Sequence, residues 1–417
     1  MKHIDVLVVG AGPAGIAAAT AAAKGGRSVL LVDDNPAAGG QIWRESTVGT
    51  QHKRDAARET ALENLRKSGA AVLAGWRIFD APEPNMLSAS SGDEVKQFQY
   101  EKLIIATGAR ERFLPFPGWT LPGVFGAGGL QALVKGVFPV AGKLVVVAGS
   151  GPLLLAVATH LQENGAKIVS IAEQASLTLL LSFTPALLSS PAKLWQGLGY
   201  KVALGSTPYH TGCWPVEALG ETHLKAVRLT NGSRTWEEPC DFLACGFHLV
   251  SNTELASLLG CAFHGDFVRV SALQETSRKD VYCVGEPAGI AGLGAALVQG
   301  EIARLACCDD IANAESLSRR YTASIHRFAI RLEKVFRLRP ELLSLANAET
   351  VVCRCEDVRF EQLVPYTSWT DAKLQTRCGM GPCQGRICGT ATRPIFWLED
   401  DVCARTAIPR ADRRFQK

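Results

Sequence analysis

The sequence predicts an α/β protein with two Rossmann-type nucleotide-binding units and a small, mostly helical C-terminal module that carries cysteines. Three observations support this prediction. An apolar strand and a glycine-rich loop open the chain at residues 4–15, residues 143–173 repeat that plan, and six of the 13 cysteines fall in the last 65 of 417 residues. Hydrophobic residues make up 47% of the chain, so sizeable cores are expected. The formal net charge is only +4, which argues against a nucleic-acid partner.

The first glycine loop has the order of elements that a dinucleotide site requires. Residues 4–9 form an apolar, β-branched run typical of a buried parallel strand, and Gly10, Gly12 and Gly15 follow at once. These glycines permit a tight turn, a close approach of the backbone to a pyrophosphate, and close packing of helix on strand. An alanine-rich helix and a second strand come next. Asp33 ends that strand, where a carboxylate would meet a ribose hydroxyl.

Two further apolar runs, at residues 103–108 and 281–286, end in small polar turns. Together with the first loop they resemble the FAD domain of the two-dinucleotide-binding flavoproteins, the glutathione-reductase-like superfamily. The resemblance implies bound FAD, a segment at Gly39-Gly40-Gln41 beside the flavin, and an acid in the last motif that contacts the ribityl chain or the pyrophosphate. That acid is Glu286, where the superfamily more often has Asp. The predicted FAD-contacting residues are Gly10, Gly12, Pro13, Ala14, Gly15, Asp33, Asp34, Gly40, Gln41, Thr107, Gly108, Gly285 and Glu286.

Residues 143–173 predict a second Rossmann unit, with a strand, a glycine loop, a helix and a second strand that ends at Glu173. Leu154 stands at the position of the third glycine and should push helix and strand apart. The predicted contacts of a second nucleotide are Gly149, Gly151 and Glu173. Its occupant stays open between NAD, another adenine nucleotide such as ATP, and none.

The cysteine distribution excludes the disulfide reductases that place a redox-active cysteine pair beside the flavin. The first 212 residues contain no cysteine, no CxxC pair precedes residue 378, and the one earlier CxxxxC pair, Cys240 and Cys245, lies in an apolar run. The seven cysteines from 213 to 308 lie in apolar contexts and are interpreted as buried thiols, and Cys403 as incidental. The eight histidines, His248 included, show no catalytic spacing. No catalytic residue is therefore assigned, and an electron-transfer flavin is expected.

The C-terminal cysteines form a CxC pair followed, 28 positions later, by a CxxxxC pair. Two such pairs can converge on one metal centre, but a zinc ribbon normally uses CxxC pairs, so a [2Fe–2S] cluster fits better. Zinc and free thiols remain the alternatives. The pattern resembles the bacterioferritin-associated-ferredoxin-like (BFD-like) [2Fe–2S] domain, in which the residue at position 378 is usually small. The resemblance therefore implies Cys353, Cys355, Cys383 and Cys388 as ligands and leaves the role of Cys378 open.

Because the FAD motifs lie at both ends of the chain, the second unit is expected to be inserted in the first. The expected FAD domain spans residues 1–111 and 246–315, and the inserted domain spans 112–245. A basic helical linker is expected at 316–346 and the BFD-like domain at 347–417.

The runs at residues 106–119, 149–155 and 252–255, with the CxC module, resemble one family over essentially the whole chain. It is the FAD-containing α subunit of heteromeric amino-acid and opine dehydrogenases, of the D-hydroxyproline dehydrogenase, octopine and nopaline oxidase, and hydrogen cyanide synthase type. The resemblance implies a redox subunit with FAD and a [2Fe–2S] cluster. An amino or imino acid, D-hydroxyproline-like or an opine, would be oxidised at a partner flavoprotein, and electrons would pass to an acceptor other than oxygen.

The same resemblance implies a hetero-oligomer with an amino-acid-oxidase-like, FAD-dependent β subunit and a small [2Fe–2S] γ subunit, and it leaves an interface FMN open. The alternative is an NADH-dependent flavoprotein reductase that feeds its own iron–sulfur cluster, which Glu173 favours and Leu154 weakens. A nucleotide-binding scaffold without catalysis is the third interpretation.

Two segments have open interpretations. Residues 319–339 carry seven basic residues and one acid, and they form either a solvated helix on their own domain or a dock for an acidic partner. Residues 177–188 are apolar and either face a partner or belong to the core. The chain shows neither a signal-peptide pattern nor an unbroken apolar span, so a cytoplasmic protein is expected, with peripheral membrane association open.

Overall fold

The structure, a computed structural model, describes residues 4–44, 56–188 and 191–396. These residues fall into two compact units, and along the chain the second is inserted in the first. The first unit holds the described residues up to 110 and residues 251–329, and the second holds 111–250 and the described part of 330–403. The finer division expected from the sequence, with a separate linker and module, stays a prediction. Cys403 lies outside the described residues.

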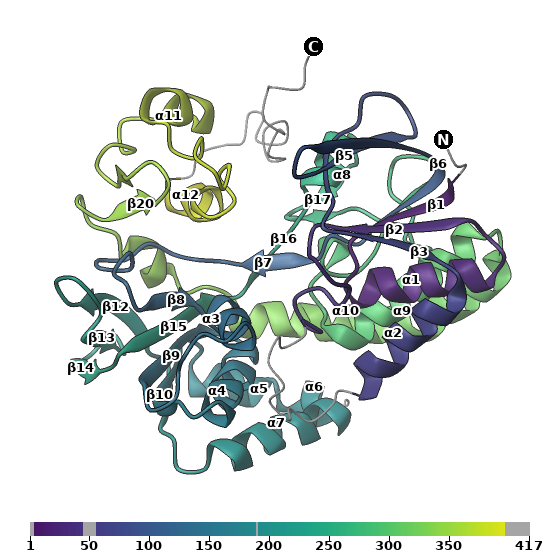
Figure 1. The fold of residues 1–417 in the computed structure, drawn as a ribbon. Helices are drawn as coiled ribbons and strands as arrows, with labels where there is room; N and C mark the ends of the chain where they lie inside the picture. Colours follow the sequence, from purple (N-terminus) through teal and green to yellow (C-terminus); the bar gives the residue numbers. More distant parts are fainter. Residues whose placement is uncertain (1–3, 45–55, 189–190, 397–417) are drawn as a thin grey trace. The chain divides into compact units, whose positions relative to one another are not determined.

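A seven-stranded sheet forms the centre of the first unit, in the order β3-β2-β1-β6-β5-β4, with β19 paired to β6 (Figure 1). The pairs β3–β2, β2–β1, β1–β6 and β6–β19 are parallel, whereas β4, β5 and β6 form an antiparallel meander. The strands are β1 (Ile4–Val9), β2 (Val29–Asp33), β3 (Ala71–Ala74), β4 (Arg77–Asp80), β5 (Met86–Ser91), β6 (Glu94–Ile105) and β19 (Val281–Cys283).

Both faces of this sheet are buried, which is why β1 is apolar at nearly every position. Val6 and Val8 point to one side, into a cluster with α1 (Pro13–Lys24), α2 (Ala56–Ser68) and α9 (Leu293–Cys307). Leu7 and Val9 point to the other side, into a cluster that includes α8 (Glu254–Leu258). The order strand, glycine loop, helix predicted for the start of the chain is therefore observed, and α1 begins at Pro13, where the proline ring suits the first helical turn.

The second unit is built on a five-stranded parallel sheet in the order β11-β10-β9-β15-β8. A three-stranded antiparallel sheet, β12-β13-β14, belongs to the same unit. The strands are β8 (Val124–Gly126), β9 (Leu144–Ser150), β10 (Lys167–Glu173), β11 (Tyr209–Thr211), β12 (Trp214–Leu219), β13 (Ala226–Thr230), β14 (Thr235–Pro239) and β15 (Phe242–Phe247). The helices are α3 (Ala127–Lys135), α4 (Leu153–Glu163), α5 (Leu177–Ser182), α6 (Thr184–Leu188) and α7 (Pro191–Leu204).

Short strands mark the points where the chain passes between the units. It leaves the first unit through β7 (Ala109–Glu111) and returns to it through β16 (Leu249–Ser251). It leaves again along α10 (Ile311–Phe336), which carries most of the predicted basic segment.

Three of the C-terminal cysteines, Cys353, Cys378 and Cys388, lie in a small, separate cluster of buried residues within the second unit. Its elements are β20 (Val351–Cys353), β21 (Val358–Arg359), α11 (Trp369–Thr376) and α12 (Cys388–Phe396), and η2 (Pro340–Ser344) precedes them in the chain. The indole Nε1 of Trp119 donates a hydrogen bond to the carbonyl oxygen of Val351 across 2.6 Å, and the guanidinium of Arg354 lies 5.3 Å from the Trp119 ring centre. These contacts attach the cysteine-bearing segment to the inserted Rossmann unit.

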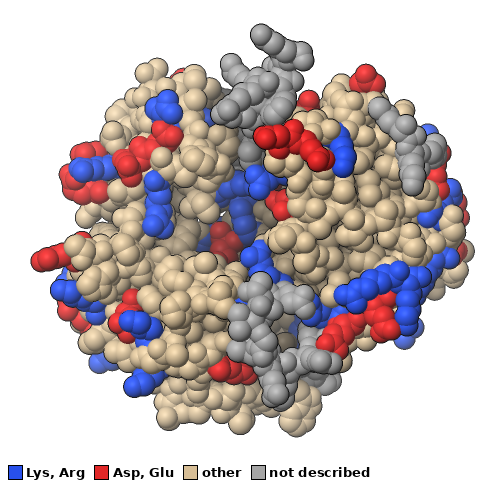
Figure 2. All heavy atoms as spheres, viewed as in Figure 1, with Lys and Arg blue, Asp and Glu red and all other residues tan. Residues whose placement is uncertain are grey.

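Charges of both signs occur in small, interspersed groups on the face shown in Figure 2. Among the described residues, no helix combines the length and the apolarity that a membrane span requires.

Candidate functional site

The first glycine loop has the backbone geometry of a phosphate cradle. Gly10 has φ +107°, and a Cβ there would overlap the carbonyl oxygen of Ala106. A Cβ on Gly15 would overlap the carbonyl oxygen of Gly10, so α1 can pack this closely on β1 only because residue 15 lacks a side chain. A Cβ on Gly12 would meet nothing within 4 Å. The loop therefore closes tightly on the protein side and leaves open space at Gly12, where a pyrophosphate would lie.

The carboxylate of Asp33 lies beside this loop, and its contact with a ribose stays a prediction. It accepts hydrogen bonds from the amide of Ala11 and, at 2.7 Å each, from the backbone and side-chain nitrogens of Asn35. Asp33 is buried, whereas the neighbouring Asp34 is exposed, with an oxygen 3.6 Å from Arg77. Asp33 thus fixes the loop at the ribose end of the cradle, and Asp34 borders solvent.

The Gly39-Gly40 segment crosses directly over the first glycine loop. The amide of Gly39 donates to the carbonyl oxygen of Ala11 across 2.8 Å, and a Cβ on Gly40 would stand 2.9 Å from the Cα of Gly12. Both glycines have positive φ, +136° and +59°. The sequence prediction that this segment lies beside the cofactor has this geometric support, and Gln41 is the exposed residue that follows.

The last motif closes the cradle from the side of α9. A Cβ on Gly285 would lie 3.2 Å from the Cβ of Ala14 and 4.0 Å from that of Ala296, so the first turns of α1 and α9 meet at Gly285. The amide of Gly285 donates to the side chain of Gln299 across 2.9 Å. Gly292 precedes α9 and has open space where a Cβ would point. Two helix N-termini therefore open on one space, which suits a pyrophosphate.

Glu286 follows Gly285 and is half-buried. Burial raises the pKa of Glu286, and a hydrogen bond from the backbone amide of Ala109 opposes that rise. Its carboxylate also approaches Gly108, where a Cβ would lie 3.8 Å from Oε2. A half-buried carboxyl beside the cradle is suited to accept a hydrogen bond from a cofactor hydroxyl.

An interaction that has no signal in the sequence holds the Thr107-Gly108 turn. Asn252 donates its amide to the carbonyl oxygen of Gly108 at 2.9 Å and its side-chain nitrogen to that of Thr107 at 2.9 Å, and Thr107 Oγ1 donates to the carbonyl oxygen of Asn252. Arg110 Nη1 bonds to Asn252 Oδ1 at 2.6 Å and to Glu254 at 2.7 Å. In the sequence, the run at residues 252–255 stands out only as part of the family resemblance. Its spacing does not predict this contact, because Asn252 lies 145 residues from Thr107.

The second glycine loop is only partly equivalent to the first. A Cβ on Gly149 would overlap the carbonyl oxygen of Gly246, and Gly151 has φ +106° and open space. Glu173 is fully buried, and it accepts the amides of Gly151 at 2.8 Å and Ala175 at 2.9 Å. Burial raises its pKa to about 7 against these bonds. Leu154 is buried in the core that α4 shares with the sheet.

The structure brings the C-terminal thiols together. The sulfur atoms of Cys353, Cys378 and Cys388, all buried, lie within 4.8 Å of one another. Hydrogen bonds from Cys378 and Cys388 lower the pKa of the Cys353 thiol to about 2. Cys383 bonds to Cys388, which lowers the pKa of Cys383 to about 5, and the exposed Cys355 bonds to Cys383. All five thiols therefore form one connected group.

Glycines allow the loop around Cys383 to pack this tightly. A Cβ on Gly379 would lie 2.9 Å from the ring of Trp369, and a Cβ on Gly381 would overlap the Cβ of Cys355. Thiolates at this spacing match the donor set of zinc or an iron–sulfur cluster. The four predicted ligands lie in the group, and Cys378 lies in it as well.

The remaining described cysteines are mostly inert. Six of the seven are buried, and burial raises the pKa of the Cys213 and Cys240 thiols to about 12. Cys308 differs because it is partly accessible, and hydrogen bonding with Cys307 lowers its pKa to about 6. His248 is held by its own backbone: its Nδ1 accepts the amide of Leu249 at 2.7 Å, and burial lowers its pKa to about 4.

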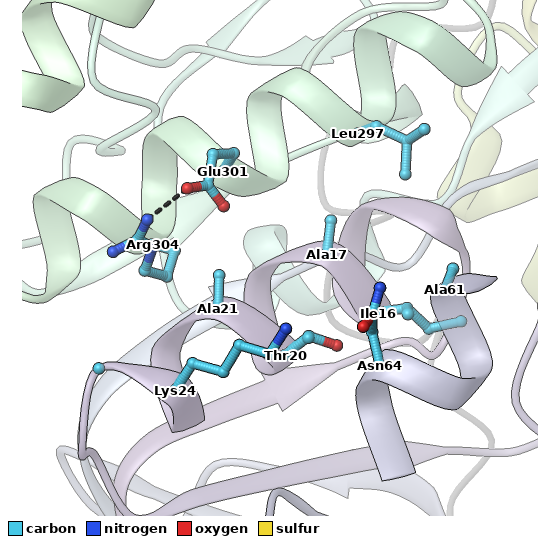
Figure 3. A pocket seen from close by; sticks show the side chains of 11 residues that line it. Ile16, Ala17, Thr20, Ala21, Lys24, Ala61, Asn64, Leu297, Glu301 and Arg304 are labelled. Atoms are coloured by element: carbon cyan, nitrogen blue, oxygen red, sulfur yellow. Dashed lines mark hydrogen bonds and ion pairs between the residues drawn. The ribbon is translucent and has the colours of Figure 1, made fainter. Parts of the chain in front are cut away.

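A separate pocket of about 520 Å³ lies between α1, α2 and α9 (Figure 3). Its apolar wall includes Ile16, Ala17 and Leu297, and one end holds Lys24 and the ion pair of Arg304 with Glu301. None of its lining residues belongs to the predicted FAD contacts, so this pocket is distinct from the cradle.

Comparison with known proteins places this geometry in a family. Residues 4–305 match the model of the pyridine nucleotide-disulphide oxidoreductases. The hydrogen cyanide synthase subunit HcnB of Pseudomonas aeruginosa is 33% identical over 93% of this chain and 91% of its own length. An opine oxidase subunit of Agrobacterium tumefaciens is 30% identical over 95% of this chain and 86% of its own length.

Solved structures support the fold. The L-proline dehydrogenase of P. horikoshii superposes with a TM-score of 0.65 and 18% identity, over 99% of this chain and 77% of that chain. The thioredoxin reductase of T. acidophilum superposes with a TM-score of 0.56 and 21% identity, over 74% of this chain and 99% of that chain. The prediction of a two-dinucleotide-binding flavoprotein fold is thereby confirmed.

Proposed function

The chain belongs to the pyridine nucleotide-disulphide oxidoreductase family, to the group of HcnB and the related opine oxidase subunits, and from this premise we propose that it is the redox subunit of a heteromeric flavin dehydrogenase. The observation that carries the proposal is the presence, in one chain, of a complete dinucleotide cradle and five connected thiols. Flavins and iron–sulfur clusters are the groups that such sites hold, and when bound they supply the electron-carrying chemistry.

The first cradle suits FAD. Gly12 leaves room for a pyrophosphate, the first turns of α1 and α9 present their free amides to it, and Asp33 and Glu286 provide carboxylates at its two sides. The chain's own task is to position the cofactor and to exclude water from it. No nucleophile or acid–base pair is needed for that task, which agrees with the lack of a catalytic unit in the sequence.

The C-terminal thiols suit a [2Fe–2S] cluster with Cys353, Cys355, Cys383 and Cys388 as ligands. Cys353 and Cys388 are adjacent, and Cys355 and Cys383 are bonded to each other, so the four thiols are arranged as two neighbouring pairs. Cys378 lies beside the first pair, and we assign it as a neighbouring thiol, not a ligand. Mutation of Cys378 alone tests this assignment separately from the rest of the proposal.

A hydrophobic surface on the second unit supports a partner subunit. Helix α7 is apolar on two sides: Leu204 is buried, whereas Trp195, Leu198 and Val202, at helical spacing, are 72%, 47% and 80% exposed. The predicted apolar stretch at 177–188 adds four exposed leucines, at positions 177, 179, 181 and 188. A helix that is apolar all round is normally buried, and a large exposed apolar patch marks an interaction site.

The partner proposed for this surface is the amino-acid-oxidase-like, FAD-dependent β subunit, with a small [2Fe–2S] γ subunit as a further member. The relatives are themselves named as subunits, of hydrogen cyanide synthase and of opine oxidase. The substrate class is an amino or imino acid, D-hydroxyproline-like or an opine, oxidised at its C–N bond on the partner. Electrons then pass to an acceptor other than oxygen, in the cytoplasm.

Anaerobic co-expression with an amino-acid-oxidase-like flavoprotein from the same organism tests the proposal. We expect a complex that contains FAD, iron and sulfide, and that reduces a dye with a D-amino acid, imino acid or opine from a panel. The chain purified alone should bind FAD and iron but leave every amine unchanged. Amine oxidation by the chain alone, or a chain without iron after reconstitution, would contradict the proposal.

A further inference from the structure

A segment of the chain's own backbone lies on the second glycine loop. The carbonyl oxygen of Phe336 accepts hydrogen bonds from Ser150 Oγ at 3.1 Å and from Gln174 Nε2 at 3.3 Å. The carbonyl oxygen of Arg337 accepts from Gln174 Nε2 at 3.0 Å, and the amide of Arg339 donates to Gln174 Oε1 at 3.0 Å. Residues 336–339, here called the strap, are thus bonded to the loop and to the residue after β10.

The strap occupies the edge where a Rossmann unit receives its ligand. Nucleotides bind outside the carboxyl ends of the parallel strands, beside the glycine loop and the acid that ends the second strand. Ser150 ends β9 between the two glycines of the loop, and Gln174 directly follows Glu173 at the end of β10. Gln174 Nε2 also bonds to Ser150 Oγ at 2.9 Å, so the strap joins a network that spans both strand ends.

The first Rossmann unit has an exposed residue at the corresponding position. Asp34 holds the position that corresponds to Gln174, directly after the acid of β2, and its side chain is 47% exposed. Gln174 is 0% exposed, although a primary amide at this position could face solvent as Asp34 does. The two copies share the glycine loop and the acid, and they differ in the exposure of the residue that follows the acid.

Apolar anchors hold the strap in place. The ring of Phe336 packs edge-on against that of Phe183, with centroids 5.8 Å apart. Leu338 and Leu342 pack into the core of the second unit, and the Arg339 guanidinium lies 4.6 Å from the ring centre of Trp214. The strap is therefore an integrated part of the unit and not a loose loop near it.

We propose that the strap takes the place of a nucleotide in the second Rossmann unit, so that this unit binds no NAD, NADH or ATP while the strap is seated. Two polar groups at the edge that would receive a nucleotide, the side chains of Gln174 and Ser150, are already bonded to the strap. The family description implies a pyridine nucleotide, and the residues present at this edge do not fit one. The NADH-dependent reductase considered from the sequence therefore loses its electron donor.

Nucleotide binding to the FAD-loaded protein, combined with amide hydrogen exchange, tests the proposal. NADH and ADP are the probes, and calorimetry measures binding while exchange reports on residues 336–342. We expect no saturable binding to the wild type at millimolar probe, with slow exchange in the strap. In Gln174→Ala the strap amides should exchange faster, and ADP should bind at least tenfold more tightly than to the wild type. The control is Gln162→Ala, which alters an exposed glutamine of the same Rossmann unit and should show neither change.

A second pair of variants tests the proposal even if Gln174→Ala does not fold. Arg339 has φ −69° and ψ 141° and precedes Pro340, so a proline fits its backbone conformation. Arg339→Pro removes the amide that bonds to Gln174, and Arg339→Ala keeps it. ADP binding should appear in the proline variant and stay weaker in the alanine variant.

Each outcome decides the question. If a probe nucleotide binds to the wild type and the strap amides then exchange faster, the result would also support the proposal, because it would show that the strap and the nucleotide exclude each other. Binding to the wild type with the strap still protected would overturn the proposal, and so would a variant with a freely exchanging strap that gains no ADP binding. These outcomes do not depend on the cluster or on a partner protein.

Discussion

Gly300 of α9 lies so close to Ala14 of α1 that a Cβ on Gly300 would overlap the Ala14 carbonyl oxygen. The two helices that open on the FAD cradle therefore pack backbone against backbone. Their spacing sets the distance between the two helix N-termini, and with it the fit of a pyrophosphate between them.

Gly300→Ala is expected to push α9 away from α1 and to weaken FAD binding. Overpacking of this kind costs about 1–3 kcal/mol, so the melting temperature should fall and bound flavin per chain should drop. Absorbance at the flavin band after gel filtration measures the loss. The control is Gly197→Ala in α7, where a Cβ meets nothing within 4 Å, and that variant should melt no lower than the wild type. Full flavin content in Gly300→Ala would show that the spacing is not critical.

The four proposed cluster ligands should be separable from Cys378. Cys353→Ser and Cys388→Ser are each expected to lose most of the iron, because every proposed ligand is needed to hold the cluster. Cys378→Ala should keep two iron and two sulfide per chain, an approximate stoichiometry that follows from the cluster type. Iron and sulfide assays with the visible spectrum measure the outcome. Loss of iron in Cys378→Ala, together with retention of iron in Cys355→Ala, would show that Cys378 is a ligand and that Cys355 is not.

Glu173 should make the stability of the protein depend on pH. Burial raises the pKa of its carboxyl from 4.5 to about 7, so the folded state binds more protons than the unfolded state between these values. The free energy of unfolding should therefore fall as pH rises from about 4.5 to about 7, by up to about 3 kcal/mol at 1.36 kcal/mol per unit. Urea unfolding across this range measures the slope. Glu173→Gln should flatten it, and Glu163→Gln, on the exposed end of α4, should leave it as in the wild type.

The bonds from Arg110 to Asn252 and Glu254 should stabilise the Thr107-Gly108 turn. Arg110→Met leaves a mostly buried carboxylate without this partner, so we expect a loss of about 2 kcal/mol in unfolding free energy and faster release of FAD. The exposed pair of Arg319 with Glu315 provides the control, and Arg319→Met should cost less than about 1 kcal/mol. Equal losses in the two variants would contradict a special role for Arg110.

Charges placed on the hydrophobic surface should disrupt assembly without disturbing the cofactors. Leu181→Glu with Val202→Glu is expected to reduce co-purification of the partner subunit at least tenfold, because a buried carboxylate at an apolar interface is costly. Flavin and iron per chain should stay unchanged. Val364→Glu, at an exposed valine of the cysteine-bearing segment, is the control. A complex that survives the double substitution would move the interface elsewhere.

The candidate sites were predictable from the sequence to different degrees. The contacts around Gly10, Gly12 and Gly15 follow from a short motif, since each glycine meets backbone groups that the strand and helix place there. The convergence of the C-terminal thiols follows from their spacing, but the place of Cys378 among them does not, because the family pattern treats that position as small. The clamp of Asn252 on Thr107 and the strap on Gln174 have no local signature at all.

The sequence by itself determined the two glycine loops, the acids that end their second strands and the clustering of thiols near the end of the chain. These features depend on residues that are near neighbours along the chain, where backbone geometry and hydrogen-bonding rules act directly. Only the tertiary structure decided which loop stays open. Gln174 meets the carbonyl of Arg337 across 163 positions, and such a contact arises from the packing of a whole unit.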